Sequence, residues 1–68
     1  MMGHRTQLFR RGDKVRHRER PDIPGMVMKV HDREPHEVPQ YVVEWERSPY
    51  GYGKRRLTHE WQDQLQVA

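Results

Sequence analysis

The sequence predicts a mostly β fold: a five-stranded small barrel with one short 3₁₀ or α turn before the last strand. Three observations predict it. Short segments alternate between apolar and polar residues, loops rich in glycine and proline separate them, and helical spacing occurs only near the C-terminus. The chain has 68 residues, which fits one small domain. We expect a flexible basic N-terminal arm at residues 1–8 and the barrel at residues 9–68.

The first half of the barrel is predicted to contain two strands. Lys14–Glu19, KVRHRE, places two arginines on the face opposite to Val15 and His17. Two prolines within Arg20–Gly25 are unfavourable in a regular strand, so we expect a loop there. Met26–His31, MVMKVH, has apolar residues on both faces, which is typical of a bent central strand shared between two sheets.

The second half follows a polar loop at residues 32–39. Gln40–Arg47, QYVVEWER, is the clearest strand, because its large apolar residues occur at every second position. Ser48–Gly53 is rich in turn-forming residues and predicts a hairpin tip. We expect its partner strand at Lys54–Leu57.

The C-terminal segment has two interpretations. Thr58 can cap a short helical turn at His59–Asp63, followed by a strand that contains Leu65 and Val67. Alternatively, apolar residues spaced four apart fit one longer helix over residues 58–66 in an α+β fold. We favour the turn and the strand, which complete the plan of an SH3-like barrel. The predicted core consists of Val15, Val27, Met28, Val30, Tyr41, Val43, Trp45, Leu57, Trp61 and Leu65.

The composition argues against several classes of protein. There is no cysteine, which excludes disulfides and thiolate metal sites. No apolar run approaches the ~20 residues of a membrane span, and the N-terminal segment has no apolar signal core. We therefore expect a cytoplasmic protein that binds neither a membrane nor a cofactor.

Charge is unevenly distributed along the chain. The net charge is +3, but residues 1–20 carry seven Lys or Arg against two acidic residues, and residues 21–50 carry three against six. A second basic cluster follows at Lys54–Arg56. Such asymmetry favours a polyanionic partner, although a solvated arginine-rich surface explains it equally well.

Several short motifs resemble known small barrels. The GDKV opening, followed by a G-x-V strand, resembles KOW and Tudor-like domains. The chain is more similar to the bacterial hypervirulence-associated TUDOR-domain family, whose motifs recur in the same order. The matching residues here are Gly12–Val15, Lys29–His31, Pro39–Val43, Lys54, His59 and Leu65. The aromatic loop at residues 48–53 departs from that pattern. The resemblance covers roughly residues 9–66 and implies a barrel that acts as a binding module.

Catalysis and metal binding have little support in the sequence. A small barrel has no deep pocket that would exclude water from a histidine–carboxylate pair, so we expect no enzyme and no small-molecule substrate. His31 and His36 flank an acidic loop, but this spacing supplies only part of a zinc site. We expect a solvated loop and no metal.

Nucleic-acid binding, directly or within a nucleic-acid assembly, has three supports. They are the basic N-terminal segment, the arginine face of the first strand, and two loop tyrosines beside the second basic cluster. Lysine and arginine neutralise phosphates, and exposed tyrosines stack on unpaired bases. The predicted binding surface consists of Arg10, Arg11, Lys14, Arg16, Arg18, Tyr50, Tyr52, Lys54, Arg55 and Arg56.

Protein docking without nucleic-acid contact is the alternative, in an adaptor or regulator. Tyrosine and arginine are frequent at interface hot spots, and Glu44 and Glu46 would attract a basic partner. In both cases we expect a monomer or a weak dimer, because an open strand edge can pair with a second copy. Alternation predicts that Tyr41 and Trp45 belong to the core, which leaves Tyr50 and Tyr52 exposed at the hairpin tip.

Overall fold

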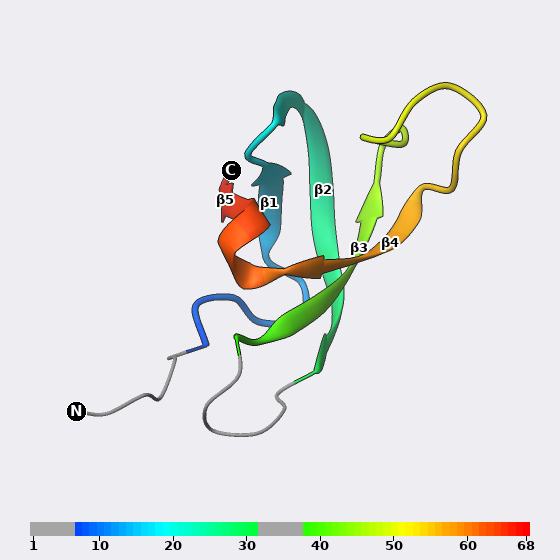
Figure 1. The fold of residues 1–68 in the computed structure, drawn as a ribbon. Helices are drawn as coiled ribbons and strands as arrows, with labels where there is room; N and C mark the ends of the chain where they lie inside the picture. Colours follow the sequence, from blue (N-terminus) through cyan, green and yellow to red (C-terminus); the bar gives the residue numbers. More distant parts are fainter. Residues whose placement is uncertain (1–6, 32–37) are drawn as a thin grey trace.

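The computed structural model describes residues 7–31 and 38–68 (Figure 1). These residues form one antiparallel sheet with the strand order β4-β3-β2-β1-β5. The predicted mostly β class is confirmed, as is a short 3₁₀ turn before the last strand. No helix of the described residues is long and apolar enough to span a membrane. The elements are β1 (Lys14–His17), β2 (Arg20–His31), β3 (Gln40–Trp45), β4 (Leu57–Trp61), η1 (Gln62–Gln64) and β5 (Leu65–Val67).

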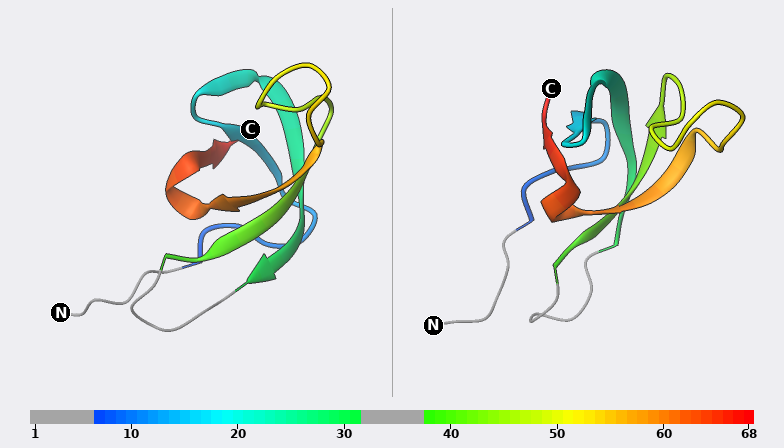
Figure 2. Two further views of the ribbon diagram at one scale, coloured as in Figure 1. Left: turned by 45° about the vertical axis from the view of Figure 1, so that its right-hand side comes forward. Right: turned by 45° about the horizontal axis from the view of Figure 1, so that its top comes forward.

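The long strand β2 belongs to both halves of the sheet. Its first part, from Arg20 to Met26, pairs with β1. Its second part, from Gly25 to His31, pairs with β3. The register shifts between Val27 and Lys29, as expected for a bulge that bends a strand. The sheet curves strongly at this strand (Figure 2). The strand is central and bent, as expected, but the expectation that two sheets share it is wrong, because all five strands belong to one sheet.

The predicted loop at residues 20–25 is wrong, because these residues extend β2. Proline lacks an N–H, but its carbonyl can still accept a hydrogen bond. The Pro21 carbonyl accepts from the Arg16 guanidinium at 2.9 Å, and the Pro24 carbonyl accepts from the Glu46 backbone N–H at 2.9 Å. Ile23, between the two prolines, is buried with 1% exposure.

The predicted strand at residues 54–57 and the predicted turn at residues 59–63 both begin too early. The connection after β3 is longer than a hairpin tip, and its last residue, Arg56, accepts the Trp45 N–H at 2.8 Å. Thr58 lies inside β4 and caps no helix. The alternative helix over residues 58–66 is also wrong, since the only helical residues in that range are Gln62–Gln64.

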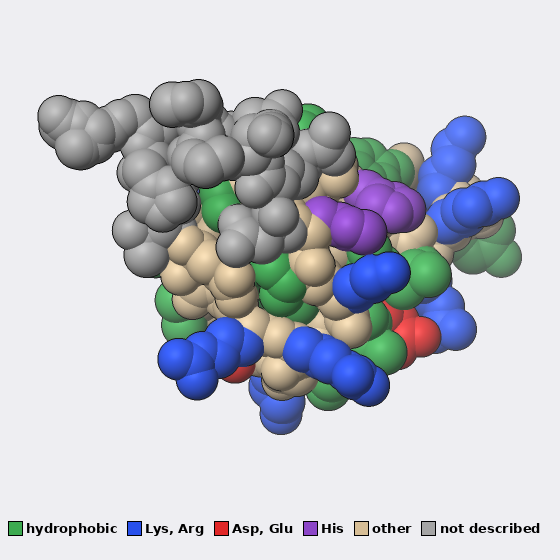
Figure 3. Space-filling model, turned by 90° about the horizontal axis from the view of Figure 1, so that it is seen from below, with side chains coloured by type: hydrophobic (Ala, Val, Ile, Leu, Met, Phe, Trp, Pro, Cys, Tyr) green, Lys and Arg blue, Asp and Glu red, His purple; other side chains and the backbone are tan. Residues whose placement is uncertain are grey.

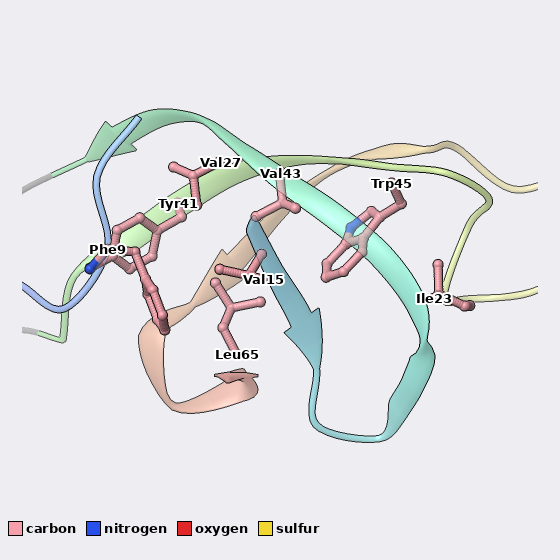
Figure 4. Close-up of a cluster of buried hydrophobic side chains, with 8 residues drawn as sticks. All are labelled: Phe9, Val15, Ile23, Val27, Tyr41, Val43, Trp45 and Leu65. Carbon is pink, nitrogen blue, oxygen red and sulfur yellow. The ribbon is translucent and has the colours of Figure 1, made fainter. Parts of the chain in front are cut away.

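Eight hydrophobic side chains fill the inside of the curved sheet (Figure 4). Six of them were predicted from the sequence. Met28, Leu57 and Trp61 were predicted as core but are 40%, 51% and 40% exposed, because they lie on the outer side of their strands; Val30 is partly buried against the core. The eight buried residues are Phe9, Val15, Ile23, Val27, Tyr41, Val43, Trp45 and Leu65.

The segment before β1 is attached to the core at Phe9. Its ring packs edge-on against Tyr41, with ring centroids 5.4 Å apart. The Tyr41 hydroxyl accepts the backbone N–H groups of Leu8 and Phe9, each at 3.3 Å. Residues 1–6 of the predicted arm lie outside the described residues.

Candidate functional site

A long loop, residues 46–56, connects β3 to β4. It is held beside the first part of β2, where Arg47 pairs with Asp22 and the Glu46 N–H donates to the Pro24 carbonyl. Between this loop and the start of β2 lies a groove of about 340 Å³. Arg20 lines it from β2, and every other lining residue comes from the loop. We call it the basic groove; its lining residues are Arg20, Arg47, Ser48, Gly51, Tyr52, Gly53, Lys54 and Arg56.

Four cationic side chains line the basic groove, and none of the Asp and Glu residues in the described part of the chain does. Arg47 is partly neutralised, because it donates to Asp22 at 3.1 Å and lies 3.6 Å from Glu46. Exposed ion pairs of this kind contribute only about 0–1 kcal/mol, so a polyanion can displace them. The other three cations form no ion pair within residues 7–31 and 38–68.

The tip of the loop places one aromatic ring in solvent. Gly51 and Gly53 have φ values of 121° and 83°, a backbone conformation that glycine adopts without strain. They reverse the chain on either side of Tyr52, whose side chain is fully exposed. The Gly51 carbonyl accepts the Lys54 N–H at 3.1 Å and closes the turn. Tyr52 and Lys54 are therefore presented together at the groove.

A buried carboxylate anchors the same loop to the sheet. Glu60 in β4 has no exposed surface, yet no lysine or arginine of the described residues pairs with it. The Tyr50 hydroxyl lies 2.7 and 2.6 Å from its two oxygens. The Thr58 hydroxyl donates to Oε2 at 2.6 Å and accepts the Trp45 indole N–H at 2.7 Å. Hydroxyl donors thus replace the cation that usually accompanies a buried carboxylate.

His17 in β1 completes this buried cluster. Its Nδ1 accepts the Glu19 backbone N–H at 3.2 Å, so the proton of the neutral ring is assigned to Nε2. Nε2 is buried without a hydrogen bond and lies 3.5 Å from Glu60 Oε1. The ring also packs edge-on against Tyr50, with centroids 5.8 Å apart. We call His17, Tyr50, Thr58 and Glu60 the buried polar cluster, after its two buried members, His17 and Glu60; Thr58 is only partly buried.

The environment of the cluster keeps the Tyr50 hydroxyl protonated. The Tyr50 side chain is 53% exposed, but its hydroxyl contacts a carboxylate that is fully buried. Burial, the hydrogen bond to Glu60 and the negative charges of Glu60 and Glu19 raise the pKa of Tyr50 far above its ordinary value of 10.0. Tyr50 therefore acts as a hydrogen-bond donor that fixes the loop.

The structure divides the predicted binding surface into separate regions. Tyr52, Lys54 and Arg56 line the basic groove. Arg55 is exposed on the same loop but does not line the groove. Lys14 lines a neighbouring hollow of about 370 Å³, which also contains Arg56 and two glutamates, Glu44 and Glu46.

The remaining predicted cations lie elsewhere. Arg16 donates to the Pro21 carbonyl at 2.9 Å, and Arg18 donates to the Leu65 carbonyl at 3.1 Å, beside β5. Arg10 and Arg11 are exposed in the turn before β1. Figure 3 shows Lys and Arg side chains spread over the described part of the face seen from below, with hydrophobic and His side chains among them. The predicted cations are therefore spread over several elements and do not all gather at the basic groove.

Sequence reasoning missed the two groove cations outside the predicted surface, Arg20 and Arg47, and the buried residues His17 and Glu60. The alternation of apolar and polar residues in β4 predicts that Glu60 faces solvent. Its apolar residues share one face, which would ordinarily be the inner one, whereas the structure turns Thr58 and Glu60 inward. One signal for Glu60 was available in the sequence. Thr58 and Glu60 lie two residues apart, so they share one face of an extended segment, and the preceding loop contains two tyrosines that could bond to them.

The outer face of the sheet has its own features. Met26, Leu57 and Trp61 are 41%, 51% and 40% exposed there. His31 and His59 stack with ring centroids 6.0 Å apart. Within residues 7–31 and 38–68, no three His, Cys, Asp or Glu residues form a group that could hold a metal ion, and most of the predicted polar loop, including His36, lies outside the described residues.

Comparison of the chain with models of protein families, with curated proteins and with solved structures finds no match.

Proposed function

We propose that the chain is a small barrel of the SH3-like class, with the plan of KOW and Tudor domains. The strand order, the long strand shared between two halves of the sheet, and the 3₁₀ turn before β5 all support this assignment. The sheet has two edge strands, β4 and β5, which η1 connects.

We propose further that the barrel is a non-catalytic module that binds nucleic acid at the basic groove. The single observation that carries this proposal is the composition of the groove: four cations, one fully exposed tyrosine and no acidic residue of the described chain. Cations held on a fixed backbone neutralise successive phosphates and release their counterions. The site supplies what a phosphodiester chain requires: positive charge and a surface for a base.

The buried polar cluster supports a structural role over a catalytic one. Histidine, glutamate and tyrosine lie together, as they do in many acid–base sites. However, Glu60 has no exposed surface, and His17 is only 3% exposed. A substrate would have to enter the core to reach them. The cluster instead holds the loop that forms the groove.

Oligonucleotide binding tests the proposal with two variants of equal charge. Lys54→Glu with Arg56→Glu reverses two groove cations, and Arg10→Glu with Arg11→Glu reverses two cations outside it. Fluorescence anisotropy with a labelled oligonucleotide at low salt should show roughly tenfold or greater weakening for the groove variant and a much smaller effect for the control. Equal weakening, or no binding by the wild-type chain, would exclude the groove as the site.

Protein docking remains the second candidate, supported by the outer face of β4. Leu57 and Trp61 expose about half of their surface there, and Met26 lies in the same cross-strand row as Leu57. Such residues are typical of protein interfaces. Glu44 separates Met26 from Leu57 in this row, which makes the apolar area discontinuous. For this reason the basic groove is the first choice.

A further inference from the structure

The two tyrosines of the β3–β4 loop differ in what they leave available to a ligand. The Tyr50 ring packs against His17 and its hydroxyl is held by Glu60. Tyr52 is fully exposed and forms no side-chain hydrogen bond or ring contact within the described residues. An aromatic ring left entirely in water gains nothing for folding. Its position at the basic groove indicates a role toward a ligand.

The backbone beneath Tyr52 is held in place before any ligand arrives. The Tyr50 N–H donates to Ser48 Oγ at 3.1 Å, and the Gly51 carbonyl accepts the Lys54 N–H at 3.1 Å. Together with the Tyr50–Glu60 contact, these bonds anchor the loop on both sides of its tip. A binding surface ordered in advance loses less conformational entropy on binding.

The groove also has a limited size. A volume of about 340 Å³ lies at the lower end of the range for small-ligand sites, roughly 300–1,000 Å³. A groove of this volume offers room for about one nucleotide at a time, beside the exposed ring of Tyr52.

We infer that the basic groove selects single-stranded nucleic acid, with the phosphates on its cations and an unpaired base stacked on Tyr52. This inference rests on the proposed function. In a duplex each base is already stacked on its neighbours and paired across the helix, so the Tyr52 ring finds no free base face. Duplex and single strand share the phosphate contacts, but only the single strand can use the ring.

The test compares two ligands and two substitutions at one position. Single strands of about ten nucleotides, in DNA and RNA form, and the matching duplexes are titrated with the wild-type chain, Tyr52→Ala and Tyr52→Phe at one fixed salt concentration. The wild type should bind single strands more tightly than duplexes. Tyr52→Ala should weaken single-strand binding about 5- to 150-fold and leave duplex binding unchanged, while Tyr52→Phe should keep most of the affinity.

The possible failures are distinguishable. Equal affinity of the wild type for single strand and duplex, or equal weakening of both by Tyr52→Ala, overturns the single-strand inference and leaves the nucleic-acid function standing. Absence of binding to both ligands overturns the proposed function as well. Because Tyr52 is fully exposed, Tyr52→Ala should unfold at the same urea concentration as the wild type, so a loss of affinity reports on the ligand.

Discussion

The Tyr50 hydroxyl lies within 2.7 Å of both carboxylate oxygens of Glu60, a side chain that the sheet removes completely from solvent. This contact joins the β3–β4 loop to β4 and so fixes one wall of the basic groove. It also leaves Tyr52 as the ring that faces outward. The geometry of the groove therefore depends on a polar contact in the interior.

Removal of the Tyr50 hydroxyl should destabilise the fold. Tyr50→Phe leaves a buried carboxylate with one hydroxyl donor fewer, and a hydrogen bond to a charged group contributes about 1.5–3 kcal/mol. We expect the free energy of unfolding to fall by about this amount in urea denaturation. Tyr52→Phe is the matched control and should change it by less than about 0.5 kcal/mol. Equal stability of the two variants would contradict the anchoring role of Tyr50.

The same contact predicts a loss of stability at alkaline pH. The pKa of Tyr50 is raised in the folded chain above its ordinary value of 10.0, so the unfolded chain releases the phenol proton first. The stabilisation by Tyr50 is fully present below about pH 10 and is lost as the pH rises through the higher folded-state pKa. The difference in unfolding free energy between wild type and Tyr50→Phe should therefore shrink above pH 10. A difference that stays constant or grows there would refute this assignment.

The two tryptophans should differ strongly in their contribution to stability. Trp45 is 1% exposed and its indole N–H is bonded to Thr58, whereas Trp61 is 40% exposed on the outer face. Trp45→Ala should cost about 3–5 kcal/mol, most of the stability of a small domain. Trp61→Ala should cost less than about 1.5 kcal/mol. Thermal melts of both variants check this, and a Trp45→Ala protein that melts like wild type would contradict the core assignment.

Gly25 should tolerate no side chain. A Cβ at this position would lie 2.4 Å from Cε3 of Trp45 and 2.9 Å from Cγ1 of Val43, too close for either buried side chain to accommodate. We expect Gly25→Ala to cost about 1–3 kcal/mol or more in urea denaturation. Gly53→Asn is the control, because nothing lies within 4 Å of that Cβ position and asparagine accepts a positive φ. If both variants unfold alike, close packing at Gly25 is not the reason for the glycine.

Much of the sheet could be predicted from the sequence, because alternation records burial directly. Tyr41, Val43 and Trp45 occupy every second position and all three are buried in β3. The prediction is wrong where burial and hydrophobicity separate. In β4 the apolar residues face solvent and Glu60 faces the core, so the same alternation indicated the wrong side.

The candidate site was harder to predict than the fold. Tyr52, Lys54 and Arg56 follow from composition, since a loop of glycines, tyrosines and cations is seldom buried. Arg20 lies more than 25 residues from these loop residues in the sequence, and only the folded β1–β2 hairpin brings it to the groove. The prolines in β2 predict a loop, and nothing in the local sequence marks Glu60 as the buried partner of Tyr50. The position of Arg20 beside the β3–β4 loop could therefore not be predicted from the sequence.

The salt dependence of oligonucleotide affinity tests the central claim most directly. For single strands the slope of log K against log salt changes by about 0.7 for each phosphate contact. Lys54→Ala with Arg56→Ala should therefore reduce the slope by about 1.4, whereas Arg10→Ala with Arg11→Ala, the matched control outside the groove, should leave it nearly unchanged. The same reduction in both variants would show diffuse attraction to a basic chain and would contradict a binding site at the groove.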